Sequence, residues 1–212
     1  ESVRRAQRAV ADGLFKAEIA AVSVKGKQGD LLLDTDETPG QCDINKIPKL
    51  RAAFKPDGGT VTAAASASIS DGAAALILMT ASQAKARGIA PLARILGHAS
   101  NAHEPAWLTT APVGAIDGLQ RKLDWTPKDV DLYEINEAFA VVTMAAMKDL
   151  NLPHEKVNIN GGACALGHPI GATGARLIVT LLHALKARGG KRGIASLCIG
   201  GGEATALAVE LL

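Results

Sequence analysis

Two short motifs near the carboxyl end of the chain hold the side chains best suited to chemistry. One is Gly167-His168-Pro169-Ile170-Gly171, and the other is Cys198-Ile199-Gly200-Gly201-Gly202. Flanking glycines let the backbone approach a ligand closely, and a proline fixes the entry to a helix. An imidazole and a thiol in such settings favour acid–base or thiol chemistry on an acyl group.

His168 precedes a predicted helix over 172–188, whose amino-terminal end stabilises developing anions through its partial positive charge. Its motif contains no second histidine or carboxylate at ligand spacing, so we expect no metal there. A structural histidine in a tight turn is the alternative role.

Cys198 ends a predicted strand over 194–197 and precedes consecutive glycines, whose N–H groups can stabilise an oxyanion. Open α/β sheets bind their ligands beyond the carboxyl ends of strands. The thiol could therefore act as a nucleophile or proton carrier, or pack as a small apolar side chain.

Asn136-Glu137-Ala138-Phe139 connects a predicted strand over 131–135 to a predicted helix over 137–150. Asn136 suits a helix N-cap, and its amide equally suits holding a water or an acyl oxygen. Glu137 suits either a functional role or a solvated helix start. We expect Asn136, His168 and Cys198 to converge, each from the end of a strand, at one edge of a sheet.

The other two cysteines, Cys42 and Cys164, are expected to take no part in chemistry. Gly161-Gly162-Ala163-Cys164 lacks both the Lys-Ser/Thr of a phosphate loop and the spacing of a dinucleotide motif. Three cysteines without CxxC spacing argue against a disulfide framework and a zinc site, and favour a reducing compartment.

The composition excludes several classes of protein. Apolar residues make up 48% of the 212 residues and aromatic residues only 3%, which predicts a core of small aliphatic side chains. A net charge of +2 gives no overall attraction to nucleic acid or a membrane surface. The longest apolar runs, such as 73–79, are too short to span a bilayer. No signal peptide is visible. The chain starts inside an amphipathic pattern at Glu1, as a fragment would.

From about residue 70, short apolar runs alternate with helical periods, which favours a layered α/β domain. The last two strands have no helix between them, so we expect a hairpin around 200–202 and one antiparallel edge. The predicted strands cover 74–79, 92–98, 131–135, 157–159, 194–197 and 205–210. The predicted helices cover 82–87, 113–123, 137–150 and 172–188, after a first helix that ends near residue 12.

In their order and spacing, these motifs resemble those of the thiolase family, and its acetyl-CoA acetyltransferase branch in particular. Gly59-Thr60-Val61-Thr62 and Ser70-Asp71-Gly72-Ala73-Ala74-Ala75 extend the resemblance over essentially the whole chain. The resemblance implies a thiolase-like layered α/β fold with a mostly parallel sheet that ends in an antiparallel hairpin. It also implies part of a coenzyme A-binding loop domain over 1–69 and a C-terminal thiolase domain over 70–212.

The resemblance implies a role for each group. His168 would activate a nucleophilic cysteine and donate to the thioester oxygen, and Cys198 would move the α-proton of a second acetyl-CoA. Asn136 would hold a water of one oxyanion hole, and the amide of Gly200 would help to form another. The reaction would be a Claisen condensation of two acetyl-CoA to acetoacetyl-CoA and coenzyme A, or the reverse thiolysis. Its enolate is the species that most needs stabilising.

The resemblance also implies contacts with the coenzyme A thioester, which is a substrate, so no separate cofactor or metal is expected. Asp43 and Lys46 match positions near its nucleotide end. Ala67 stands where the family usually has a serine that contacts pantetheine, and Leu108 where a methionine often lines the acyl pocket. Phe139 is predicted to contact the same substrate.

The family's acyl-accepting cysteine belongs to an N-terminal half that this sequence does not include, and none of its three cysteines matches it. We therefore predict that this polypeptide alone forms no acetyl-enzyme. The full-length protein is expected to be a cytoplasmic homodimer or homotetramer without nucleic-acid or membrane partners. Two alternatives stay open: a cysteine–histidine acyl hydrolase with Cys198 as nucleophile, and a non-catalytic acyl-CoA-binding relative.

Overall fold

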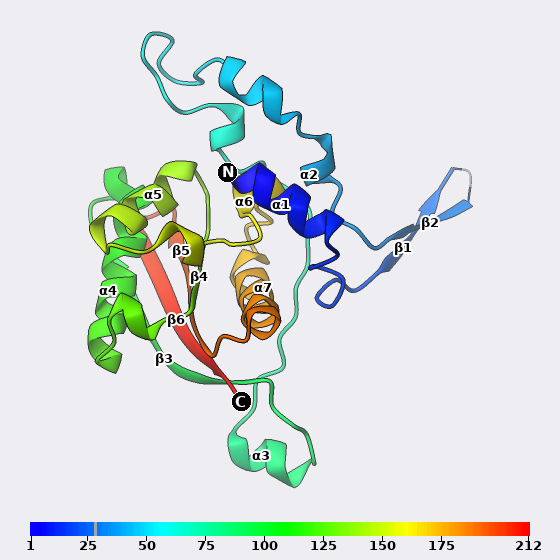
Figure 1. Cartoon of the computed structure of the whole chain (residues 1–212), viewed down its shortest axis with the longest axis vertical. Helices are drawn as coiled ribbons and strands as arrows, with labels where there is room; N and C mark the ends of the chain where they lie inside the picture. Colours follow the sequence, from blue (N-terminus) through cyan, green and yellow to red (C-terminus); the bar gives the residue numbers. More distant parts are fainter. Residues whose placement is uncertain (28) are drawn as a thin grey trace.

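A mixed four-stranded sheet forms the centre of the computed structural model, which describes residues 1–27 and 29–212 (Figure 1). Its strand order is β3-β6-β5-β4, with β3 at Ala93–Ala102, β4 at Leu132–Ile135, β5 at Arg192–Ile199 and β6 at Glu203–Leu211. β4 is parallel to β5, whereas β6 is antiparallel to both β5 and β3. β3, β4 and β5 therefore run in one direction and β6 in the other.

This arrangement confirms the layered α/β fold and its terminal hairpin. The sheet is mixed rather than mostly parallel, because β4 and β5 pair in parallel whereas β6 pairs antiparallel with both of its neighbours. β6 lies between β5 and β3, so the reversed strand is inside the sheet and not at its edge. The apolar residues of β6 explain this place, because Ala204, Ala206 and Ala208 are buried on one face and Val209 on the other.

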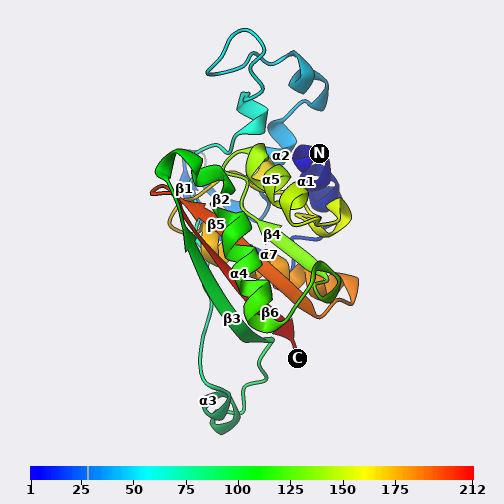
Figure 2. The same ribbon diagram turned by 90° about the vertical axis from the view of Figure 1, so that its left-hand side faces the viewer.

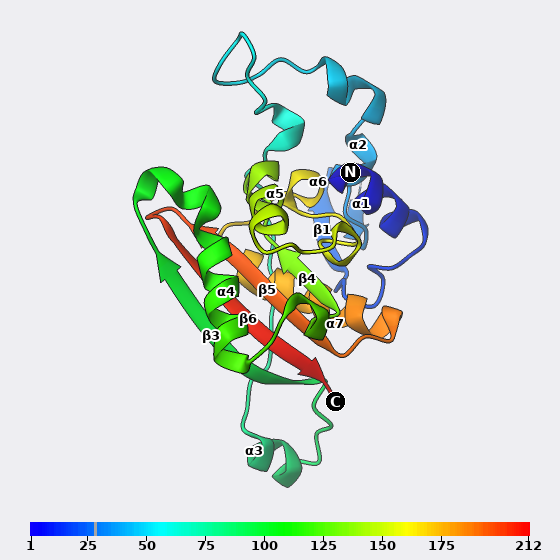
Figure 3. The ribbon, with the colours of Figure 1, turned by 60° about the vertical axis from the view of Figure 1, so that its left-hand side comes forward.

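Helices cover both faces of the sheet (Figures 2 and 3). α4 (Ala111–Leu123) and α5 (Ala140–Asp149) pack on one face, and α7 (Thr173–Arg188) packs on the other. α7 buries Leu177, Leu181 and Leu185, whose spacing of four residues aligns them on one side of a helix. Alternate residues of the strands, such as Ile194 and Ala195, supply the two cores.

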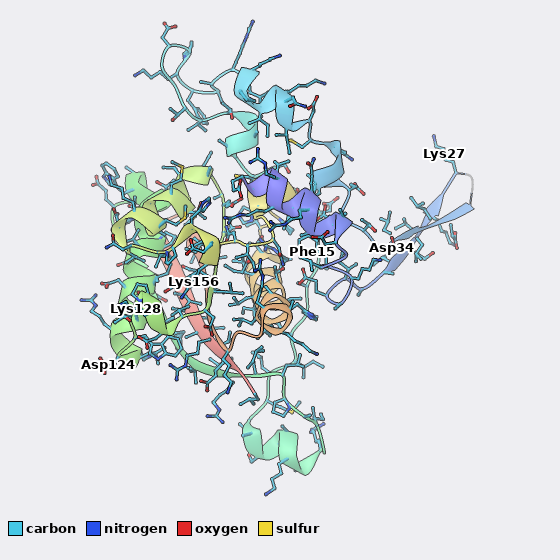
Figure 4. The ribbon with its side chains drawn as sticks, viewed as in Figure 1. Phe15, Lys27, Asp34, Asp124, Lys128 and Lys156 are labelled. Atoms are coloured by element: carbon cyan, nitrogen blue, oxygen red, sulfur yellow. The ribbon has the colours of Figure 1, made fainter. Side chains whose placement is uncertain are left out.

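The region before the sheet is more extended. α1 (Ser2–Ala11) packs with Val3 and Ala6 against α6 (Ala163–Leu166). A hairpin of β1 (Val22–Gly26) and β2 (Gly29–Leu33), which the sequence did not predict, projects from the body. Figure 4 shows Lys27 and Asp34 on this projection and Phe15 close to the body. Short helices follow: α2 (Thr38–Gln41), η1 (Ile44–Lys49), η2 (Ala63–Ala65) and α3 (Ala81–Ala86).

Two predicted strands and one helix start are wrong. Residues 74–79 adopt no regular structure, because no other described segment pairs with their backbone. Their side chains are also poorly covered, since Ile77 is 87% exposed. Residues 157–159 form only one parallel bridge, between Val157 and Tyr133, and the positive φ of Asn158 (46°) interrupts an extended chain. α5 starts at Ala140 and not at 137, since the preceding residues are extended.

Within the described ranges, no helix combines the length and apolar character needed to cross a membrane. The division of the chain near residue 70 stays a prediction. Residues 66–69 touch the C-terminal part directly, since Ser66 bridges Phe139 and Ile69 bridges His168.

Candidate active site

The backbone around His168 is held tightly between two parts of the chain. Gly167 has φ +86°, and a side chain there would collide with Ser70. The His168 N–H donates to the Ser68 carbonyl at 2.9 Å, and the Pro169 ring lies against Gly72. His168 thus lies in a fixed turn between α6 and α7, and not at the end of a strand as the sequence suggested.

The imidazole of His168 has a polar partner at each nitrogen. Nδ1 lies 2.6 Å from Thr173 Oγ1, and Nε2 lies 3.4 Å from Asn136 Nδ2. Burial, and then the positive charge of Arg176, lower the pKa of His168 below its ordinary value. The ring is therefore neutral near pH 7 and can act as a base.

Asn136 contacts the ring of His168 and pairs with β5 two residues before Cys198. Its backbone N–H donates to the Ser196 carbonyl at 2.9 Å, which extends the pairing of β4 with β5 toward Cys198. The side chain is fully buried, and no described residue donates a hydrogen bond to Oδ1. Buried amide oxygens normally accept a hydrogen bond, so Oδ1 is suited to a bound water or substrate. Phe139 precedes α5 directly, so the alternative N-cap role of Asn136 is wrong.

Cys198 lies near the carboxyl end of β5 and is half-buried against the main core. Burial raises the pKa of its thiol above the ordinary value, so the thiol is protonated at neutral pH. The hairpin turn begins just beyond it with exposed Gly200. Gly202 has φ +89°, and a side chain there would strike the backbone of His103, so this turn requires glycine.

Glu137 holds several segments of the chain together, a role that the sequence analysis did not predict. It is buried, and its carboxylate accepts from the Ser2 hydroxyl at 2.7 Å, the Asn158 amide at 3.0 Å and the Cys164 N–H at 3.1 Å. A solvated helix start is therefore wrong. The nearby glycines were a usable signal, because a side chain at Gly162 would collide with this carboxylate.

Thr173 is the second residue that the sequence analysis missed. It is fully buried in the first turn of α7, and its hydroxyl donates to the Pro169 carbonyl at 2.9 Å. The available signal was a small hydroxyl residue five positions after the histidine, where a helix begins.

The predicted substrate contacts fall into two groups. Ala67 donates its N–H to the Ala138 carbonyl at 3.0 Å, and its neighbour Ser66 bridges Phe139, so Ala67 and Phe139 lie together beside the histidine turn. Leu108 is half-buried in η3 (Pro105–Thr110), which packs against α5 and β5.

Asp43 and Lys46 form the second group of predicted substrate contacts. Asp43 is the N-cap of η1 and Lys46 lies within it; both are exposed, and their side chains pair with each other at 3.7 Å. No hydrogen bond or ion pair in the described part of the chain links them to His168, Asn136 or Cys198.

A cavity of about 290 Å³ lies between α1, η2 and α5. Glu137 and Cys164 line it, whereas His168, Asn136 and Cys198 do not. Burial raises the pKa of the Cys164 thiol, which contacts the Glu137 carbonyl. The predicted packing role of Cys164 agrees with these contacts. Over residues 1–27 and 29–212, no group of three or more metal-ligating side chains comes together.

Comparison with known proteins gives a consistent assignment. The family model of the thiolase C-terminal domain matches residues 89–211, and that of the thiolase N-terminal domain matches residues 1–82. Acetyl-CoA acetyltransferase 2 of Arabidopsis thaliana is 48% identical to this chain, and the match covers 100% of this chain and 53% of that protein.

Solved structures agree with these matches. The crystal structure of the acetyl-CoA acetyltransferase of Bacillus anthracis superposes with a TM-score of 0.95 at 43% identity, covering 100% of this chain and 54% of that one. A thiolase of Ascaris suum in complex with coenzyme A gives a TM-score of 0.89 at 37% identity, with 100% and 53% covered. The chain spans about half the length of the curated relatives it matches.

Proposed function

This chain belongs to the thiolase family, and from that premise we propose that it supplies the carboxyl-terminal part of an acetyl-CoA acetyltransferase. The reaction is the condensation of two acetyl-CoA to acetoacetyl-CoA and coenzyme A, or the reverse thiolysis. The coenzyme A thioesters are substrates, and the proposal requires no further cofactor. The observation that carries it is the contact of a neutral His168 with the buried amide of Asn136.

In the proposed acylation step, His168 Nε2 takes the proton from an acyl-accepting thiol of the N-terminal half. The thiolate forms a bond to the thioester carbonyl carbon, and the bond to the coenzyme A sulfur breaks. The resulting imidazolium N–H, together with a water held by Asn136, stabilises the oxyanion. The protonated state of Cys198 suits it to give its proton to the departing coenzyme A thiolate.

In the proposed condensation step, the Cys198 thiolate removes the α-proton of a second acetyl-CoA, and the amide of Gly200 stabilises the enolate oxygen. The enolate carbon then attacks the acetyl-enzyme carbonyl. Expulsion of the enzyme thiolate, which recovers its proton from His168, releases acetoacetyl-CoA. At the end of this step, His168 has returned its proton to the enzyme thiolate and Cys198 is again a thiol.

The acyl hydrolase is the weaker alternative. A nucleophilic cysteine needs a lowered pKa and an imidazole beside it, whereas burial raises the pKa of Cys198. The imidazole of His168 instead meets Thr173 and Asn136. A non-catalytic acyl-CoA-binding relative would have no need of these prepared groups.

The proposed path of the coenzyme A substrate runs along the residues predicted to contact it. Ala67 and Phe139 adjoin the histidine turn, which supports a pantetheine contact there. Leu108 would limit the acyl chain, and Asp43 and Lys46 would meet the nucleotide end. Lys46 is exposed and can reach a phosphate as a point charge.

Assembly and compartment are proposed from family resemblance: a homodimer or homotetramer in the cytoplasm, with no nucleic-acid or membrane partner. Light scattering after gel filtration tests the assembly, and fractionation of the source cells tests the compartment. A stable monomer, or recovery in an organelle fraction, would overturn the respective statement.

The proposal is tested with the complete protein that contains this chain, supplied with acetoacetyl-CoA and free coenzyme A. We expect acetyl-CoA as the product and a loss in kcat of about 10²–10⁴-fold for both His168→Ala and Cys198→Ala. Cys42→Ala is the matched control and should retain full activity, since Cys42 packs in a separate minor cluster. Free acetoacetate would indicate hydrolysis, and binding without turnover would indicate a non-catalytic relative.

A second test uses the 212-residue polypeptide alone. Incubated with acetyl-CoA, it should show no added acetyl mass by intact mass spectrometry, because it lacks the acyl-accepting cysteine. An acetyl group mapped to any of its three cysteines would contradict this expectation.

A further inference from the structure

The hydroxyl of Thr173 joins the histidine ring to the backbone of the same turn. It is fully buried, donates to the Pro169 carbonyl at 2.9 Å and lies 2.6 Å from His168 Nδ1. A hydroxyl has one hydrogen to donate and two lone pairs that can accept. With its hydrogen directed to Pro169, the oxygen presents a lone pair to Nδ1.

This arrangement determines which ring nitrogen carries the hydrogen. Nδ1 must be the donor, and the single hydrogen of a neutral imidazole is then used, so Nε2 has a free lone pair. Asn136 agrees from the other side, because its Nδ2 donor faces Nε2 at 3.4 Å. The two contacts independently favour the same tautomer.

The charge state of the ring makes this choice important. Burial and the positive charge of Arg176 lower the pKa of His168, so the neutral ring dominates near pH 7. If the single hydrogen were on Nε2, that nitrogen would have no lone pair for a proton arriving from the active site. A histidine protonated on Nδ1 accepts that proton directly.

We propose that Thr173 is a positioning residue that holds His168 in the Nδ1–H tautomer, with Nε2 free to act as the base. Thr173 is fully buried, so in this proposal it acts through the ring alone. The inference rests on the proposed function for its kinetic consequence, whereas the tautomer can be observed independently of activity.

The kinetic test compares three variants of the complete protein. Thr173→Val removes the hydroxyl at nearly constant volume, and we expect kcat to fall about 10- to 100-fold with little change in KM. Thr173→Ser keeps the hydroxyl and should restore most of the activity. Thr180→Val is the matched control: Thr180 is also buried in α7, but its hydroxyl binds Glu18, so kcat should stay within about 2-fold.

The structural test is neutron diffraction from a deuterated crystal of the complete protein near pH 8. We expect deuterium on Nδ1 of His168, none on Nε2, and the Thr173 hydroxyl deuterium directed to the Pro169 carbonyl. Deuterium on Nε2 alone would overturn the inference even if Thr173→Val were inactive.

The remaining outcomes are equally decisive. Full kcat in Thr173→Val, or no recovery in Thr173→Ser, would show that the hydroxyl does not position the ring for catalysis. A complete protein without thiolase or acetyltransferase activity would overturn the proposed function, and the neutron map would still decide the tautomer.

Discussion

The layered core over 93–212 and the exposed segments before it use apolar residues very differently. In the core, α4 and α5 cover one face of the sheet and α7 the other, so alternate strand residues are buried on both sides. In the exposed segments, Leu32 of β2 and Ile77 are 59% and 87% accessible to solvent. Apolar sequence produced a packed strand only where a neighbouring element was present to cover it.

The hairpin β1–β2 and residues 74–79 refine this contrast. Both segments are apolar and exposed, yet only the hairpin forms strands, because β1 and β2 satisfy each other's backbone hydrogen bonds. Residues 74–79 pair with no described strand, so their backbone stays irregular. Backbone pairing therefore decided the local structure, and side-chain burial decided where a core forms.

The largest expected effect comes from removing core volume. Leu181→Ala should lower the free energy of unfolding by about 2–5 kcal/mol, because Leu181 is fully buried between α7 and β5. The matched change Leu32→Ala on the exposed hairpin should cost less than about 0.5 kcal/mol. Urea denaturation monitored by circular dichroism measures both, and equal losses would break the contrast between the two regions.

Glu137 tests the connection between the regions, because its carboxylate links Ser2 of α1 to Asn158 and Cys164. Glu137→Gln should cost about 2–3 kcal/mol, since all three of its hydrogen-bond partners are donors and the new amide must face one of them. Hydrogen exchange should also become faster in α1. Glu155→Gln, at an exposed position in η5 (His154–Lys156), is the control. Unchanged exchange in α1 would contradict this role.

Glu18 joins the N-terminal region to α7, and its titration makes the stability of the protein depend on pH. Burial raises the pKa of Glu18 to about 7, while the hydroxyl of Thr180 donates to its carboxyl group. The folded protein therefore retains a proton that the unfolded chain loses above its ordinary pKa near 4.5. Stability from this group falls as the pH rises from about 4.5 to 7.

Glu18→Gln removes this dependence. We expect the variant to be more stable than the wild type by about 1–2 kcal/mol at pH 8, after allowance for partial solvent exposure, and not at pH 4. Urea denaturation at both pH values measures the difference. A variant that is less stable at pH 8 would show that the ionised carboxylate is favourable in the folded protein.

The smallest expected effect on stability is at Lys46. Its ion pair with Asp43 is exposed, so Lys46→Ala should change the free energy of unfolding by less than about 0.5 kcal/mol. In the complete protein, the KM for coenzyme A in thiolysis should nevertheless rise if Lys46 meets a phosphate. Lys49→Ala in the same helix is the control, and equal effects on KM would argue against a specific contact.

Much of the core and part of the site could be predicted from the sequence. The stripe Leu177, Leu181 and Leu185 has helical spacing, and the glycines at 200–202 indicate a hairpin turn. These signals are local, so they survive in the fold. Residues 74–79 had an equally strong local pattern, but a strand also needs a partner, which one segment of sequence cannot supply.

The sequence by itself determined which chemical groups are present and how their turns are built, because residue type, glycine and proline act locally. It placed His168 between Gly167 and Pro169 and Cys198 before a glycine turn. Only the tertiary structure decided that Asn136 meets His168, that Thr173 binds the opposite ring nitrogen, and that Glu137 is buried. Those relations depend on contacts between distant residues and on shielding from water, which follow from packing and not from local sequence.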